Sequence, residues 1–123
     1  MSRKLFSISA VATLLGSSAI ADVPNVSVDI APLHSLVASV MNGVGVPSLI
    51  IPPGSSPHDH QLRPSEAKAM QDANIVFWMG EELTPWMENA VKTLSSNASV
   101  TTFLENDKTS LLEFREGALF EAH

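Results

Sequence analysis

The strongest constraint on the fold is the regular alternation of two hydrophobic patterns along the chain. Short apolar runs typical of β-strands alternate with segments whose apolar residues recur every three or four positions, as on one face of a helix. The strand-like runs are residues 26–30, 48–51, 74–79 and 98–103, and the helical segments are residues 33–41, 64–73 and 84–94. We therefore expect an α/β fold with a mainly parallel four-stranded sheet and helices on both faces.

The first 21 residues have the features of an export signal. Arg3 and Lys4 precede an uncharged, mostly apolar stretch, and residues 19–21 (Ala-Ile-Ala) form the small-x-small pattern that signal peptidases accept. The stretch is too short and too rich in serine and glycine for a membrane span. We expect a signal peptide at residues 1–21 and a protein of the bacterial periplasm. The chain has no cysteine, so it has neither disulfides nor a cysteine for a lipid anchor.

The charge of the chain argues against a nucleic-acid partner. Thirteen acidic and seven basic residues give a formal net charge of −6, and removal of the signal would take away Arg3 and Lys4. Binding of nucleic acid requires a basic surface, so we expect no nucleic-acid partner. An acidic surface is compatible with attracting cations, although it also serves solubility alone.

Residues 52–66 carry the strongest indication of a binding site. Their sequence, Pro-Pro-Gly-Ser-Ser-Pro-His-Asp-His-Gln-Leu-Arg-Pro-Ser-Glu, places His58 and His60 between a proline- and glycine-rich turn and the start of a helix. Imidazole and carboxylate groups bind borderline metals such as zinc, and a stiff loop loses little entropy on holding one. Because the loop follows a strand, it lies at the carboxyl edge of the sheet, where ligands bind in such folds.

Three blocks of the sequence resemble the zinc-uptake solute-binding proteins, the periplasmic components of ABC importers for zinc. The blocks are residues 29–37 (Asp-Ile-Ala-Pro-Leu-His-Ser-Leu-Val), residues 52–66, and residues 73–80 (Ala-Asn-Ile-Val-Phe-Trp-Met-Gly). They occur in the order and spacing of that family, and the resemblance runs from about Val26 to Leu94.

The resemblance implies a two-lobed metal-binding protein of which this chain contains one lobe. In that family two α/β lobes are joined by a long helix, and histidines from both lobes plus a carboxylate hold the metal between them. Residues 22–104 would form the N-terminal metal-binding lobe. Residues 105–123 would be a truncated segment that leads into a His-rich loop, to which His123 would belong. The remaining ligands would come from a lobe that this chain lacks.

The candidate site residues follow from the same comparison. The ligand histidine after the Pro-Gly-Ser turn of the family falls on His58, our main metal ligand. His60 is a second candidate, and His34 is a third because it follows the first strand at the same edge. We expect Asp59 to orient a ring nitrogen or cap the next helix, and Arg63 to brace the loop by pairing with a carboxylate or a carbonyl.

The resulting functional hypothesis is a binding protein, not an enzyme. We expect a monomer that captures Zn(II) in the periplasm and delivers it to the membrane permease of an ABC transporter, with Mn(II) less expected because manganese sites contain more carboxylate oxygen. One alternative is a zinc metallohydrolase that uses His58 and His60 as two ligands and needs a third ligand and an open water position. Another is a truncated fragment that binds metal weakly.

Overall fold

A computed structural model of the protein describes residues 22–112 and contains one four-stranded parallel sheet. Its elements are β1 (Val26–Val28), α1 (Ala31–Val40), β2 (Ser48–Leu49), α2 (Pro64–Asp72), β3 (Ile75–Trp78), α3 (Met87–Leu94) and β4 (Ser99–Thr102). The strand order is β2-β1-β3-β4, and every neighbouring pair is parallel. The expected α/β fold with a parallel four-stranded sheet is confirmed. The expected signal peptide and His123 lie outside the described residues.

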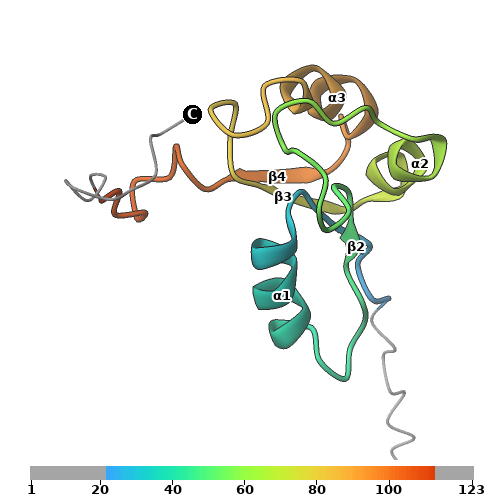
Figure 1. Ribbon diagram of the computed structural model, residues 1–123. Coiled ribbons are helices and arrows are strands. Elements are labelled where there is room, and N and C mark those ends of the chain that lie inside the picture. Colours follow the sequence, from blue (N-terminus) through green and yellow to red (C-terminus); the bar gives the residue numbers. More distant parts are fainter. Residues whose placement is uncertain (1–21, 113–123) are drawn as a thin grey trace, which may run out of the picture.

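The helices cover both faces of the sheet, as expected. α2 and α3 lie together over one face, and α1 lies on the other (Figure 1). Side chains alternate between the two faces along each strand, so β3 contributes to two separate hydrophobic clusters. Val76 and Trp78 pack with Met70 of α2 and Met87 of α3, whereas Phe77 points toward α1. Burial of each such side chain stabilises the fold by about 1.5–3 kcal/mol.

Two helix starts differ from the sequence-based expectation. The first helix was expected from residue 33, but α1 begins at Ala31 and takes Pro32 into its first turn. The missing N–H of proline costs nothing there, because the first N–H groups of a helix have no partner within it. α3 begins at Met87 instead of Thr84, and the Thr84 N–H donates to the Gly80 carbonyl in a turn that follows β3.

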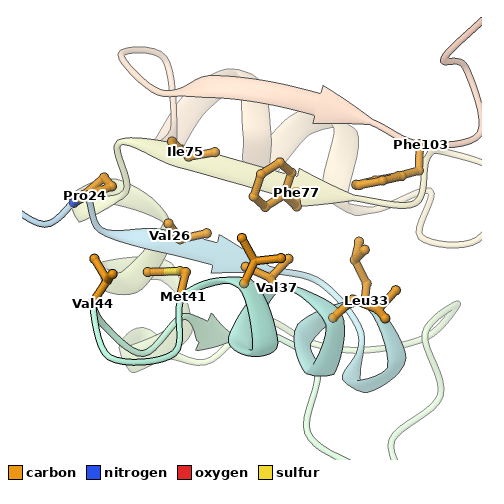
Figure 2. A pocket seen from close by; sticks show the side chains of 11 residues that line it. Pro24, Val26, Leu33, Val37, Met41, Val44, Ile75, Phe77 and Phe103 are labelled. Atoms are coloured by element: carbon orange, nitrogen blue, oxygen red, sulfur yellow. The ribbon is translucent and has the colours of Figure 1, made fainter. Parts of the chain in front are cut away.

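On the α1 face the structure has an apolar groove beside the helix (Figure 2). The groove has a volume of about 420 Å³ and lies between α1 and the side chains of Val26, Phe77 and Phe103. Leu36 and Val40, on the groove side of α1, are 67% and 85% exposed. Among residues 22–112, α1 is the one helix on this face. No helix in that range is long and apolar enough to cross a membrane.

A buried carboxylate joins the carboxyl ends of the two central strands. The side chain of Asp29 is fully buried just after β1; its Oδ1 accepts the Ile30 N–H and its Oδ2 accepts the Met79 N–H beyond β3, both at 2.7 Å. Burial raises the pKa of Asp29 above its usual 3.8, and the hydrogen bonds from Met79 and Ile30 offset this only in part. The carboxyl edge of the sheet is therefore closed by one side chain.

We expect Asp29→Asn to destabilise the fold by about 1–3 kcal/mol, because the amide has one acceptor oxygen where two N–H groups need one each. Because its pKa is raised on folding, the wild-type side chain adds to the free energy of unfolding. This added stability is fully present below pH 3.8 and is lost as the pH rises through the raised pKa. The penalty of the substitution should therefore be larger at pH 4 than at pH 7, as measured by urea unfolding.

The matched control for this prediction is Asp72→Asn. Asp72 is exposed and pairs with Lys68 one helical turn away, so its substitution should change the free energy of unfolding by less than about 0.5 kcal/mol. A penalty for Asp29→Asn that grows with pH would mean that the backbone hydrogen bonds outweigh burial and lower the pKa of Asp29.

Candidate functional site

The candidate site is the loop between β2 and α2, at the carboxyl edge of the sheet. Its root is firmly held, because the N–H groups of Ile50 and Ile51 continue the ladder onto the carbonyls of Val28 and Asp29 at 2.9 Å, and both isoleucine side chains are buried. The loop therefore leaves the core from a fixed point, where the sequence placed it.

A tight turn follows at the start of the loop. The Ser55 N–H donates to the Pro52 carbonyl at 3.1 Å, and Gly54 has a φ of +84°. Proline fixes φ at its own position, and only glycine adopts a positive φ without strain. The Pro-Pro-Gly sequence thus allows the chain to turn tightly between β2 and α2.

His58 and Asp59 are both exposed, as are Pro53, Gly54 and Ser56 earlier in the loop. Both side chains reach solvent, and the imidazole of His58 is accessible to a metal ion. Asp59 does not cap α2, since that role is taken by Glu66, whose Oε2 accepts the Arg63 N–H at 2.7 Å. Proposed roles for His58 and Asp59 in metal binding stay predictions.

His60 differs sharply from His58 although it is only two residues away. Its side chain is 5% exposed, and its Nε2–H donates to Glu66 Oε2 at 2.8 Å. The same carboxylate lies 3.8 Å from Arg63 Nε, in a looser ion pair whose arginine is mostly exposed. Glu66 therefore binds the His60 ring and the Arg63 N–H through Oε2, and its Oε1 faces the Arg63 side chain.

The charge state of Glu66 fits these contacts. Burial by itself raises the pKa of this carboxyl group, but hydrogen bonds from the Arg63 N–H and the His60 ring, together with the Arg63 charge, hold the pKa below its usual 4.5. The group is therefore ionised at neutral pH and is an acceptor for its neighbours.

Trp86 contacts the other side of the loop. Its Nε1–H donates to the Pro57 carbonyl at 2.8 Å, and its ring lies 5.5 Å from the His60 ring at an angle of 52°. No pattern in the chain indicates the tryptophan contact, whereas a glutamate three residues after a helix N-cap is a known capping signal for Glu66.

His34 is engaged elsewhere. It lies in the first turn of α1, and its Nε2–H donates to the Pro47 carbonyl just before β2 at 2.9 Å. Within residues 22–112, no group of three or more His, Cys, Asp or Glu side chains is arranged to hold a metal ion. Among the described residues the structure therefore does not gather His60 and His34 around His58.

Comparison with known proteins gives a consistent family and fold. The sequence model of the family described as zinc-uptake complex component A, periplasmic, matches residues 26–118. The high-affinity zinc uptake system protein ZnuA of Brucella abortus (strain 2308) is 40% identical over 108 residues, which are 88% of this chain and 32% of that protein. The chain thus spans about a third of the length of the relatives it matches.

Two solved structures show the same fold. The periplasmic zinc binding protein TroA from Treponema pallidum aligns with a TM-score of 0.60 and 19% identity over 65% of this chain and 29% of that one. A Mn-bound periplasmic metal binding protein from Candidatus Liberibacter asiaticus aligns with a TM-score of 0.61 and 14% identity over 76% of this chain and 35% of that one.

The geometry of the turn generates a further prediction. A Cβ at Gly54 would meet nothing within 4 Å, so the cost of Gly54→Ala is the backbone strain of a positive φ alone, about 1 kcal/mol. Gly43, with a φ of +80° and equally open surroundings, is the matched control at the end of α1. Chemical denaturation should give similar losses for both alanine variants. Amide chemical shifts should change along residues 52–60 in the first variant only, and equal effects on that loop would contradict the prediction.

Proposed function

Because this chain belongs to the family of zinc-uptake complex component A, periplasmic, we propose that it binds zinc ion in the periplasm for delivery to an ABC importer. The observation that carries the proposal is the position of His58, which is exposed on a loop fixed at both ends at the carboxyl edge of a parallel sheet. Its work is selective binding and release, so no catalytic role is assigned.

The metal is Zn(II) in this proposal, and His58 is the main ligand. The relatives at up to 40% identity are named for zinc uptake, and an imidazole ligand suits zinc. A distant neighbour of the same fold holds manganese, but at 14% identity it speaks for the fold alone. His34 and His60 both have Nε2 in hydrogen bonds to protein groups, which supports His58 over either.

The chain would act as one lobe of a larger protein. Residues 22–104 are the proposed metal-binding lobe, residues 1–21 the export signal, and residues 105–123 the segment that leads into a His-rich loop. The relatives are about three times as long, which leaves room for a second lobe that supplies the other ligands. The partners are the zinc ion and the permease of the importer, and the protein is proposed to act as a monomer.

Zinc titration of the 123-residue chain tests the role of His58. We expect weak binding that is lost in His58→Ala and kept in His34→Ala, because one imidazole held by the loop provides the direct contact. Isothermal titration calorimetry with zinc chloride, and with manganese chloride for comparison, gives the affinities. Zinc binding that survives His58→Ala would remove the basis of the proposal.

Transport is tested in a full-length context. The part of the Brucella abortus relative that aligns with this chain is replaced by the corresponding residues, and the chimera is expressed in a strain that lacks its own zinc-uptake receptor. We expect growth in zinc-depleted medium with the chimera but not with its His58→Ala version. Equal growth of the two strains would contradict the proposal, and the amount of each protein in the periplasm is the control.

A further inference from the structure

We propose that His60 is a positioning residue: through Glu66 and the ring of Trp86 it holds the loop in the conformation that presents His58 to a metal ion, and it is not itself a ligand. This inference rests on the proposed function, since it assumes that His58 binds zinc. It assigns a separate role to each of two histidines that the sequence presents as a pair.

The first argument is the burial of His60. Its imidazole is 5% exposed beside the exposed His58 and Asp59, and burial of a polar ring is costly unless its nitrogens are hydrogen-bonded. Glu66 satisfies Nε2 at 2.8 Å. A metal ion at Nε2 would have to displace this carboxylate and leave it partly buried without its partner, which is expensive. A metal ion at Nδ1 would have to approach a ring that is only 5% exposed.

The second argument is that Glu66 connects His60 to the helix frame. Its Oε2 accepts both the His60 ring N–H and the Arg63 backbone N–H, so the loop and the first turn of α2 share one acceptor atom. α2 in turn is fixed in the core by Met70, which is fully buried. The position of the His60 ring is therefore set by a helix that cannot move independently of the core.

The third argument is that the loop is held on both sides of His58. Trp86 donates to the carbonyl of Pro57, the residue directly before His58, and its ring also packs against His60. Trp86 directly precedes α3, which is anchored by the buried Met87. His58 and Asp59 thus lie between Pro57, which is held by Trp86, and His60, which is held by Glu66. A ligand that is held in place before binding loses less conformational entropy when the metal arrives.

The first test needs no metal. The 123-residue chain is labelled with ¹⁵N in four forms: wild type, His60→Ala, His60→Gln and His34→Ala. The heteronuclear NOE of the Asp59 amide reports picosecond-to-nanosecond order of the loop. We expect it to fall in His60→Ala, to recover in His60→Gln because the amide nitrogen again donates to Glu66, and to stay unchanged in His34→Ala. An unchanged NOE in His60→Ala overturns the proposal, whether or not zinc binds.

The second test adds zinc chloride and follows the histidine ring nitrogens by long-range ¹H–¹⁵N spectra. We expect the His58 ring signals to shift and those of His60 to stay. Zinc affinity should fall about tenfold or more in His60→Ala, as for other groups that orient a metal ligand, and should largely recover in His60→Gln. A zinc-dependent shift of the His60 ring, or equal losses in both variants, identifies His60 as a ligand and overturns the proposal.

Tryptophan variants keep the proposal testable if His60→Ala fails to fold. Trp86→Phe keeps an aromatic ring near His60 and removes the hydrogen bond to the Pro57 carbonyl. Trp78→Phe is its matched control. It removes a comparable hydrogen bond of 2.7 Å, from the Trp78 Nε1–H to Thr102 Oγ1, which lies outside the loop. We expect a lower NOE at Asp59 and weaker zinc binding in the first variant only. Equal behaviour of the two folded variants, checked by circular dichroism, contradicts the two-sided support of His58.

Discussion

The candidate site depends on one buried side chain, the carboxylate of Asp29. Its two oxygens bind the N–H groups of Ile30 and Met79, and its own carbonyl accepts the N–H of Ile51 at the root of the loop. A single residue thereby joins the ends of β1 and β3 to the point where the loop leaves the sheet. Because parallel strands place their carboxyl ends at the same edge, any ligand on this loop inherits its position from that junction.

The order and type of the elements were predictable because the two hydrophobic periods differ clearly along this chain. The residues at which the helices start were harder to predict, as the position of Pro32 illustrates. Proline is compatible with the end of a strand and equally with the first turn of a helix, and the choice depends on what the following residues bury. Leu33 packs against Val26 and Val28, which settles the matter in favour of an earlier helix start.

The same contrast applies to the site. The exposed loop at the sheet edge followed from a local motif and from general rules on parallel sheets. The partners of the loop did not, because the bond from Trp86 to Pro57 joins residues 29 positions apart and exists only once α3 has packed against α2. His58 and His60 are chemically identical in the sequence. Only tertiary packing distinguishes them, by exposing one ring and burying the other.

In our proposal the metal site is assembled from two lobes, and the separate roles of His58 and His60 affect its affinity. A zinc ion held tightly by protein takes three or four ligands, and among the three histidines of residues 22–112 only His58 is exposed. What this lobe contributes in our proposal is therefore geometry. The chain on either side of His58 is held by the bonds of His60 to Glu66 and of Trp86 to the Pro57 carbonyl, and these contacts need no metal. Ligands from elsewhere then meet a histidine whose backbone is already positioned, which lowers the conformational entropy that this loop loses on binding.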